Sequence, residues 1–250
     1  MNTKVKVILA VLLAMSTQGM ACTIFGNVIA DYTGFGASDS MTIWGGNLTN
    51  YNTSAGALII NKTGGTGECV YLDNCKLGVF CIDLLETIQG GSINYNIIDT
   101  ADGPINSSCN TAMGDAKASY LSELWGRYYD NAWISGNYTS SQKAAAEAFQ
   151  AAIWEIVYEN LPTTPAYWDV TVDGTLGTGG FKATNLNSTL ANNMLRSLNG
   201  TGAMADLRVL SYNGSQDFIT AVSVPEPATI AFAMLGLVMM AKRNNKELKC

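Results

Sequence analysis

The chain has 250 residues, of which 48% are hydrophobic and only 14% are charged, as expected for one globular domain with apolar terminal segments. Its net charge of −6 argues against nucleic acid and anionic lipid as partners. The complete lack of histidine excludes a Ser-His-Asp triad, a Cys-His hydrolase and a histidine-ligated metal site.

The N-terminal segment, residues 1–21, has the parts of a secretory signal peptide. Lysines precede an apolar run, and small residues up to Ala21 provide a cleavage site. Because Cys22 follows directly, a lipoprotein signal is the competing interpretation, but Gly19 occupies the position where that motif has leucine. We expect the chain to be exported across the inner membrane, with cleavage near Ala21.

The part of the chain after the signal is rich in β-forming residues. Residues 23–60 are predicted to form short strands separated by turns. The apolar stretch 78–85 is predicted to form a further strand. Its alternation puts Cys81 and Asp83 on one face and Phe80 on the other.

The clearest helix prediction begins at Thr139 or Ser140, with a glutamine placed for a capping box, and ends at Pro162. Within this helix Gln150 shares a face with Trp154 and two β-branched residues. A buried primary amide without partners costs about 1–3 kcal/mol. Gln150 must therefore either hydrogen-bond to backbone or serve a chemical purpose.

Two further helices and a terminal hairpin complete the prediction. The apolar spacing indicates helices within 119–135 and 185–198. Strands at 208–212 and 218–222, separated by the Asn-Gly pair at 213–214, form a plausible hairpin. The expected fold class is α+β: a single compact domain whose β-rich N-terminal part, a sheet or partial barrel, packs against several helices.

The C-terminal segment, residues 224–250, combines a Pro-Glu-Pro sequence, the apolar run 228–241 and a basic end. The defining residues are Pro225, Glu226, Pro227, Lys242 and Arg243. At about 1.5 Å per residue, a helix of this run falls short of a hydrocarbon core of about 30 Å, so length alone favours a core helix. The segment resembles the PEP-CTERM sorting signal of Gram-negative bacteria. That resemblance implies transient membrane insertion with a cytoplasmic basic end, removal of the tail by an exosortase, and delivery to the cell surface or extracellular matrix. The mature domain would span residues 22–223.

Phe-Cys-Ile around Cys81, followed on the predicted helix by Gln-x-Ala-Ile-Trp from Gln150, resembles the bacterial thioester domains of Gram-positive surface adhesins. The resemblance implies an internal thioester between the Cys81 sulfur and the Gln150 side-chain carbonyl, formed with loss of ammonia. A lysine side chain of a partner would then take the acyl group and form an intermolecular amide. Such a protein binds covalently once, without turnover and without a cofactor.

Two kinds of supporting residue follow from this chemistry. An exposed lysine is mostly protonated at neutral pH, so a local base is expected, and Asp83 and Glu155 are the candidates. Trp154, one turn beyond Gln150, would shield the bond from water. Each also has an ordinary interpretation, as a hydrogen-bonded carboxylate or as core packing.

The sorting signal differs from that of Gram-positive adhesins, and no stalk of further domains is recognisable. We therefore expect adhesion or biofilm-matrix crosslinking, to protein or to amine- or hydroxyl-bearing polysaccharide. A non-reactive, exopolysaccharide-associated structural surface protein is the main alternative. A transglutaminase-like enzyme or cysteine hydrolase would lack the histidine that activates its cysteine.

Five cysteines would remain after processing, and an exported chain usually pairs its cysteines. Cys69 and Cys75 bracket a possible turn and are candidates for one disulfide, and Cys22 and Cys109 for another. This arrangement leaves Cys81 unpaired, as a thioester cysteine must be, although five cysteines permit other pairings. Their spacing lacks the Cys-x2-Cys pattern of zinc sites, so no metal is expected.

Overall fold

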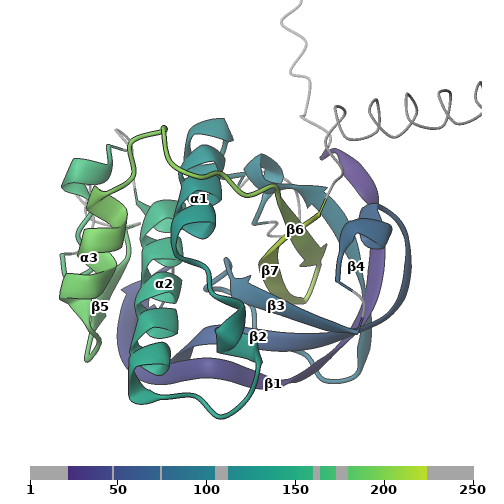
Figure 1. Cartoon of the computed structure of the whole chain (residues 1–250), viewed down its shortest axis with the longest axis horizontal. Coiled ribbons are helices and arrows are strands. Elements are labelled where there is room, and N and C mark those ends of the chain that lie inside the picture. The colour runs from purple at the N-terminus through teal and green to yellow at the C-terminus, as the bar shows by residue number, and fades with distance from the viewer. Residues whose placement is uncertain are drawn as a thin grey trace, which may run out of the picture.

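The structure is a computed structural model that describes residues 22–46, 48–73, 75–104, 112–159, 164–172 and 180–223 (Figure 1). The predicted signal peptide, the predicted sorting signal and Cys109 lie outside these residues. The sorting-signal positions concerned are Pro225, Glu226, Pro227, Lys242 and Arg243. Within the described ranges, no helix combines the length and the apolarity that crossing a bilayer requires.

The described residues form one sheet of seven strands, and every pairing is antiparallel. The strands are β1 (Ile24–Gly45), β2 (Leu48–Gly67), β3 (Lys76–Cys81), β4 (Ser92–Asp99), β5 (Lys182–Thr184), β6 (Leu207–Tyr212) and β7 (Ser215–Ala221). Their order is β2-β3-β7-β6-β4-β1-β5, and β2 also pairs with β1. The strands other than β5 thus close into a ring, and β5 extends the far end of β1.

The strands β1 and β2 are longer than predicted. The sequence predicts short strands with turns over 23–60, whereas the structure has continuous strands of 22 and 20 residues. Register shifts bend the pair, one of them between Phe35 and Ser38. Glycine permits close backbone approach here, since a Cβ at Gly56 would lie 2.4 Å from the Ala37 carbonyl oxygen. Residues that resemble turn signals therefore lie at irregularities inside long strands.

The helices are α1 (Asp115–Tyr128), α2 (Ser140–Tyr158) and α3 (Ser188–Arg196), with short 3-10 helices η1 (Glu68–Tyr71), η2 (Thr100–Asp102), η3 (Asn131–Ile134) and η4 (Pro165–Tyr167). The start of α2 confirms the capping box, because the Thr139 hydroxyl accepts from the Gln142 amide and the Gln142 side chain accepts from the Thr139 amide. The predicted helix at 119–135 is divided: α1 ends at Tyr128, and the side chain of Asp130 caps η3.

The last elements of the chain match the prediction closely. The helix predicted at 185–198 is α3, whose first turn is capped by the Asn187 side chain. The predicted hairpin is β6 with β7, in which Tyr212 pairs with Ser215 across the turn. The fold class, α+β with a β-rich N-terminal part, is confirmed.

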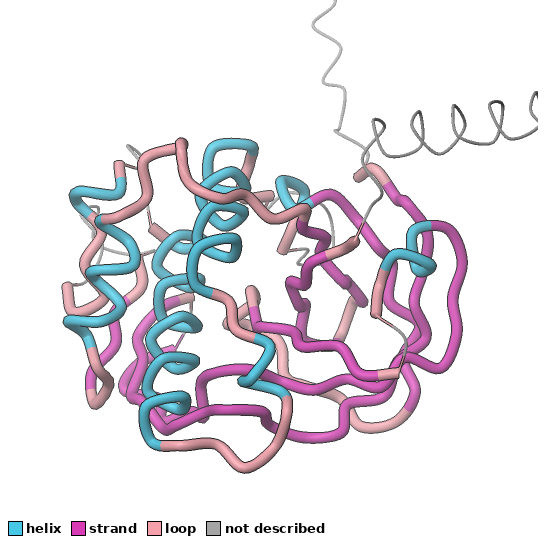
Figure 2. Tube along the Cα trace, viewed as in Figure 1, coloured by secondary structure: helices cyan, strands magenta, loops and turns pink. Residues whose placement is uncertain are grey.

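Two hydrophobic cores share the sheet. One lies inside the ring and takes side chains from each of its strands. The other lies between the outside of the sheet and the helices α1, α2 and α3, which gather on one side of the molecule (Figures 1 and 2). Successive residues of β3 alternate between them: Val79 belongs to the inner core and Phe80 to the helix-covered core, where it packs 4.8 Å from Phe149 between ring centroids. Cys81 contacts both cores.

Candidate functional site

The site begins where β3 ends. Cys81 is the last residue of β3, opposite Phe218 of β7, and its side chain is half-buried. The Ile82 amide donates to the Asp217 carbonyl at 3.1 Å, after which the chain leaves the sheet. Cys81 and Asp83 therefore lie at an end of the strand ring rather than within its packed interior.

The carboxamide of Gln150 is hydrogen-bonded to Cys81 through both of its ends. Its Oε1 accepts from the Cys81 amide at 3.0 Å, and its Nε2 donates to the Cys81 carbonyl at 2.8 Å. Gln150 is only 1% exposed. The structure thus brings together the two residues that the sequence predicts as partners, although 69 positions separate them in the chain.

A stripe on α2 holds the segment after Cys81. Gln150, Trp154 and Tyr158 follow one another at intervals of four residues and so lie on one face of the helix. The Tyr158 hydroxyl accepts from the Leu84 amide at 2.7 Å and donates to Asp83 Oδ1 at 3.3 Å. Sequence analysis missed Tyr158, and its spacing of four from Trp154 is the signal that points to it.

A cavity of about 430 Å³ adjoins this stripe. Its walls come mainly from apolar side chains of β1, β2 and the segment after β3. Cys81, Asp83, Gln150 and Trp154 all reach its lining. Most of the residues predicted to support a thioester therefore share one cavity.

Trp154 forms part of the wall of this cavity. Its side chain is 4% exposed, and its ring lies 5.8 Å from that of Phe181 between centroids. This position suits both interpretations made from the sequence, since the ring packs in the helix-covered core and also covers the cavity.

The electrostatic surroundings of Cys81 are acidic. Burial raises the pKa of the Asp83 carboxyl, an effect opposed by hydrogen bonds of which the one from the Leu85 amide is the largest. Burial, with a further contribution from the Asp83 charge, raises the pKa of the Cys81 thiol well above its ordinary value. Cys81 is therefore a protonated thiol at neutral pH, and nucleophilic attack by its sulfur needs a proton acceptor.

Glu155 does not join this group. Its Oε1 accepts from the Asp169 amide at 2.9 Å, and the residue is absent from the cavity lining. Burial, followed by the charge of Glu159, raises the pKa of Glu155 to about 8. Its neighbour Trp154 faces the cavity, and the next position along a helix points in a different direction. Of the predicted bases, the structure brings Asp83 and not Glu155 to Cys81.

One of the two predicted disulfides is absent from the structure. Cys69 and Cys75 are free thiols, so the disulfide predicted between them is not formed. Cys69 is buried, with its thiol 3.4 Å from the Gly64 carbonyl, whereas Cys75 is exposed and has a left-handed backbone. Cys81 is likewise in no disulfide. Cys22 is disulfide-bonded, and Cys109, its predicted partner, lies outside the described residues.

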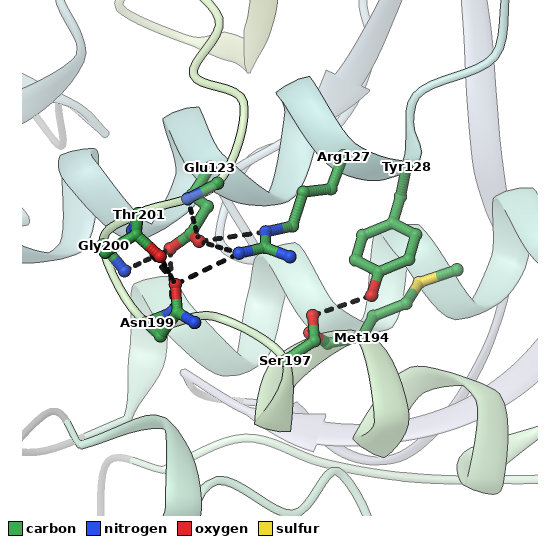
Figure 3. A network of polar contacts seen from close by, with 9 residues as sticks. Glu123, Arg127, Tyr128, Met194, Ser197, Asn199, Gly200 and Thr201 are labelled. Carbon is green, nitrogen blue, oxygen red and sulfur yellow. Dashed lines mark hydrogen bonds and ion pairs between the residues drawn. The ribbon is translucent and has the colours of Figure 1, made fainter.

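A network of polar contacts surrounds Glu123 of α1, which does not line this cavity (Figure 3). The carboxylate receives hydrogen bonds from Arg127 and from backbone amides after α3.

The described parts of the chain contain no group of three or more cysteine, aspartate or glutamate side chains placed to bind a metal ion. Comparison with protein families, curated proteins and solved structures finds no match for this chain.

Proposed function

We propose that the chain is an exported surface or extracellular-matrix protein that forms an internal thioester between Cys81 and Gln150 and uses it to attach covalently to amine-bearing partners. The observation that carries the proposal is the pair of hydrogen bonds, 3.0 and 2.8 Å long, between the Gln150 carboxamide and the peptide groups of Cys81. They hold the carboxamide beside the residue whose sulfur would attack it, at the wall of a cavity large enough for a small amine.

The chemistry has two steps. The Cys81 sulfur attacks the carboxamide carbon of Gln150, and ammonia leaves. The thioester so formed is a much better acyl donor than an amide, because a thiol with a reference pKa of about 8.5 provides a competent leaving group. An incoming amine then takes the acyl group of Gln150 and releases Cys81. The reaction consumes the site, so the protein acts once and is not an enzyme.

The terminal signals support a role outside the cell. A secretory signal at 1–21 and a sorting signal at 224–250 would deliver the domain, after processing by an exosortase, to the surface or the matrix. The partners available there are proteins with lysine side chains and polysaccharides with amine or hydroxyl groups. Adhesion or crosslinking of a biofilm matrix is the role that combines this location with single-use covalent chemistry.

A second candidate is a non-reactive structural surface protein associated with exopolysaccharide. The same hydrogen bonds favour it, because they satisfy both ends of the Gln150 carboxamide without any covalent bond. In that case Cys81 and Gln150 serve only to join α2 to the end of β3.

Coupling of a labelled primary amine separates the two candidates. The purified protein is incubated with the amine, denatured, and analysed for retained label and for the labelled peptide. The thioester predicts label on Gln150, abolished by Cys81→Ala and by Gln150→Ala. Cys75→Ala, which removes an exposed free thiol, and Gln89→Ala, which removes an exposed amide, serve as controls and should label like the wild type. Labelling that survives Cys81→Ala would overturn the proposal.

A further inference from the structure

Asp83 holds its two carboxylate oxygens in different surroundings. Oδ1 accepts from the Leu85 amide at 2.7 Å and from the Tyr158 hydroxyl at 3.3 Å. Oδ2 is buried and has no hydrogen-bond partner among the residues that the structure describes. The side chain is 1% exposed and lines the cavity beside Cys81. Because an unsatisfied buried carboxylate oxygen is unfavourable, its partner is expected to come from the cavity or from the thiol.

The cavity has the chemistry of an alkylammonium site. Its walls include the buried side chains of Ile43, Leu58 and Leu84. Glu86, in the same lining, also has a buried oxygen without a partner in the described chain, its Oε2. A cavity with apolar walls and carboxylates in its lining suits a ligand that carries an ammonium group on an unbranched alkyl chain.

We infer that this cavity binds the attacking primary amine as its ammonium ion, and that Asp83, positioned by Tyr158, transfers the protons for both steps of thioester chemistry. The inference rests on the proposed function and adds the binding site, the proton-transfer group and its positioning residue. Tyr158 occupies Oδ1, and Oδ2 is left without a donor among the described residues and so available for proton transfer.

During thioester formation, Asp83 accepts the thiol proton of Cys81 as the sulfur attacks the carboxamide carbon of Gln150. The bond between carbon and sulfur forms, and the bond between carbon and nitrogen breaks. Asp83 gives the proton to the departing nitrogen, which leaves as ammonia. The carboxylate ends the step in the state in which it began.

During aminolysis, the bound ammonium ion gives one proton to Asp83 and becomes the neutral amine. Its nitrogen attacks the thioester carbon, the bond to sulfur breaks, and Asp83 returns the proton to the sulfur of Cys81. The amine nitrogen loses a second proton to solvent as the amide forms. The products are an amide on Gln150, a free thiol and one proton.

The charges around Asp83 suit this role. Burial raises the pKa of its carboxyl and so strengthens it as a proton acceptor. Cys81, Glu86 and Tyr158 are its titratable neighbours, Asp217 acts in turn on Tyr158, and all four are acids. Because none of these neighbours is a lysine or arginine, their charges attract a cationic ligand and none of them repels it.

The test is the pH dependence of the rate at which the full chain couples to n-butylamine. The adduct is measured from the intact mass of the protein. In the wild type the rate should stay level between the pKa of Asp83 and that of the amine, because Asp83 deprotonates the bound cation. In Asp83→Asn the rate should fall about tenfold for each pH unit below the pKa of the amine, as only free amine reacts. A folded Asp83→Asn protein that forms no thioester would also support the inference, since the first step needs the same group.

Three further measurements keep the test decisive. In Tyr158→Phe the coupling rate should stay level over a narrower pH range than in the wild type. If Asp83→Asn does not fold, this narrowing is the result that tests the inference. Glu155→Gln, which alters a buried carboxylate outside the cavity, should leave the profile unchanged. γ-Aminobutyrate, which has the stem of butylamine but ends in a carboxylate, should react at least about tenfold more slowly because Asp83 and Glu86 repel it.

The outcomes separate the two proposals. A wild-type mass equal to that of the sequence, with no amine adduct, would end both. A wild-type thioester whose pH profile is the same in Asp83→Asn would overturn this inference and leave the proposed function standing. Equal rates for the two amines would overturn the assignment of the cavity as the ammonium site.

Discussion

Glu123 and Asp83 are both buried carboxylates, with 0% and 1% of their surface exposed, yet their surroundings are opposite. Glu123 accepts five hydrogen bonds, two from Arg127 and one each from the amides of Asn199, Gly200 and Gly202. Asp83 has two donors on one oxygen and none, among the described residues, on the other.

The pKa values of the two carboxyls move in opposite directions as a result. Burial raises both, but at Glu123 the hydrogen bonds, led by that from the Gly200 amide, outweigh burial and lower the pKa. At Asp83 they do not, and the pKa is raised. Burial therefore does not by itself distinguish a structural carboxylate from a reactive one. The number of hydrogen-bond donors that the fold supplies to the carboxylate makes this distinction.

The comparison also explains what each group does for the fold. Glu123 joins α1 to the segment that follows α3, with Arg127 and the 199–202 backbone converging on one carboxylate (Figure 3). Asp83 joins no other described residue through its Oδ2. A residue of the first kind is needed for stability, and one of the second kind is available for chemistry.

The largest expected effect on stability is that of Glu123→Gln. The substitution leaves Arg127 without its carboxylate at 2.6 Å and weakens three backbone hydrogen bonds, so the free energy of unfolding should fall by about 3 kcal/mol. Urea denaturation at pH 7 measures it. A loss below about 1 kcal/mol would show that the network around Glu123 is not the structural element described here.

Glu155→Gln should change the pH dependence of stability. Glu155 has one partnered and one unpartnered oxygen, and burial raises its pKa from 4.5 to about 8. Between these two pH values the folded state therefore binds the carboxyl proton of Glu155 more tightly than the unfolded chain does. The stability from this group is complete below pH 4.5 and is lost as the pH rises through about 8.

As the pH rises from 6 to 9, the free energy of unfolding should thus fall less in Glu155→Gln than in the wild type. Thermal unfolding across this range checks the slope, with Glu68→Gln, which removes a partly buried carboxylate paired with Arg208 on another element, as the control. An identical slope in the variant and the wild type would contradict the raised pKa.

Arg127→Lys should have a smaller effect. Lysine keeps the charge but cannot place two nitrogens, Nε and Nη2, on the same carboxylate oxygen as arginine does at 2.9 and 2.6 Å. The backbone donors to Glu123 remain, so the loss should be about 1 kcal/mol in urea denaturation. A loss as large as that of Glu123→Gln would mean that the backbone amides contribute little.

Asp83→Asn should have the smallest effect on stability, within about 1 kcal/mol of the wild type, because it removes a buried charge that the fold does not neutralise. Compared with Glu123→Gln, Glu155→Gln and Arg127→Lys, the same variant should have the largest effect on amine coupling. Parallel urea denaturation and coupling assays measure both, and a stability loss comparable to that of Glu123→Gln would cancel the contrast between the two carboxylates.

The sequence predicted the elements that local rules control. The capping box at Thr139 and the hairpin around 213–214 each depend on residues close together in the chain, and the structure has both. The strand predicted at 78–85 is present as β3, but it ends at Cys81, so Asp83 lies beyond the strand and not on its face as predicted. The predicted juxtaposition of Cys81 and Gln150 also appears, although it depends on packing α2 against β3.

The features that sequence reasoning missed depend on tertiary structure. The long strands β1 and β2 contain glycines that look like turns, because bulges and turns use the same residues. The choice of Asp83 over Glu155 follows from the side of α2 that faces β3. The spacing of Tyr158 from Trp154 places it on the same face of α2, but its hydrogen bond to Asp83 depends on tertiary structure. The disulfide expected between Cys69 and Cys75 is not formed, and the fold buries the first thiol and exposes the second.

The intact mass of the purified protein, measured without any added amine, tests the central claim most directly. The account predicts a mass lower than that of the processed sequence by one ammonia, with the full mass restored in both Cys81→Ala and Gln150→Ala after allowance for the substitution. A wild-type mass equal to that of the sequence, with Cys81 alkylated as a free thiol, would contradict it.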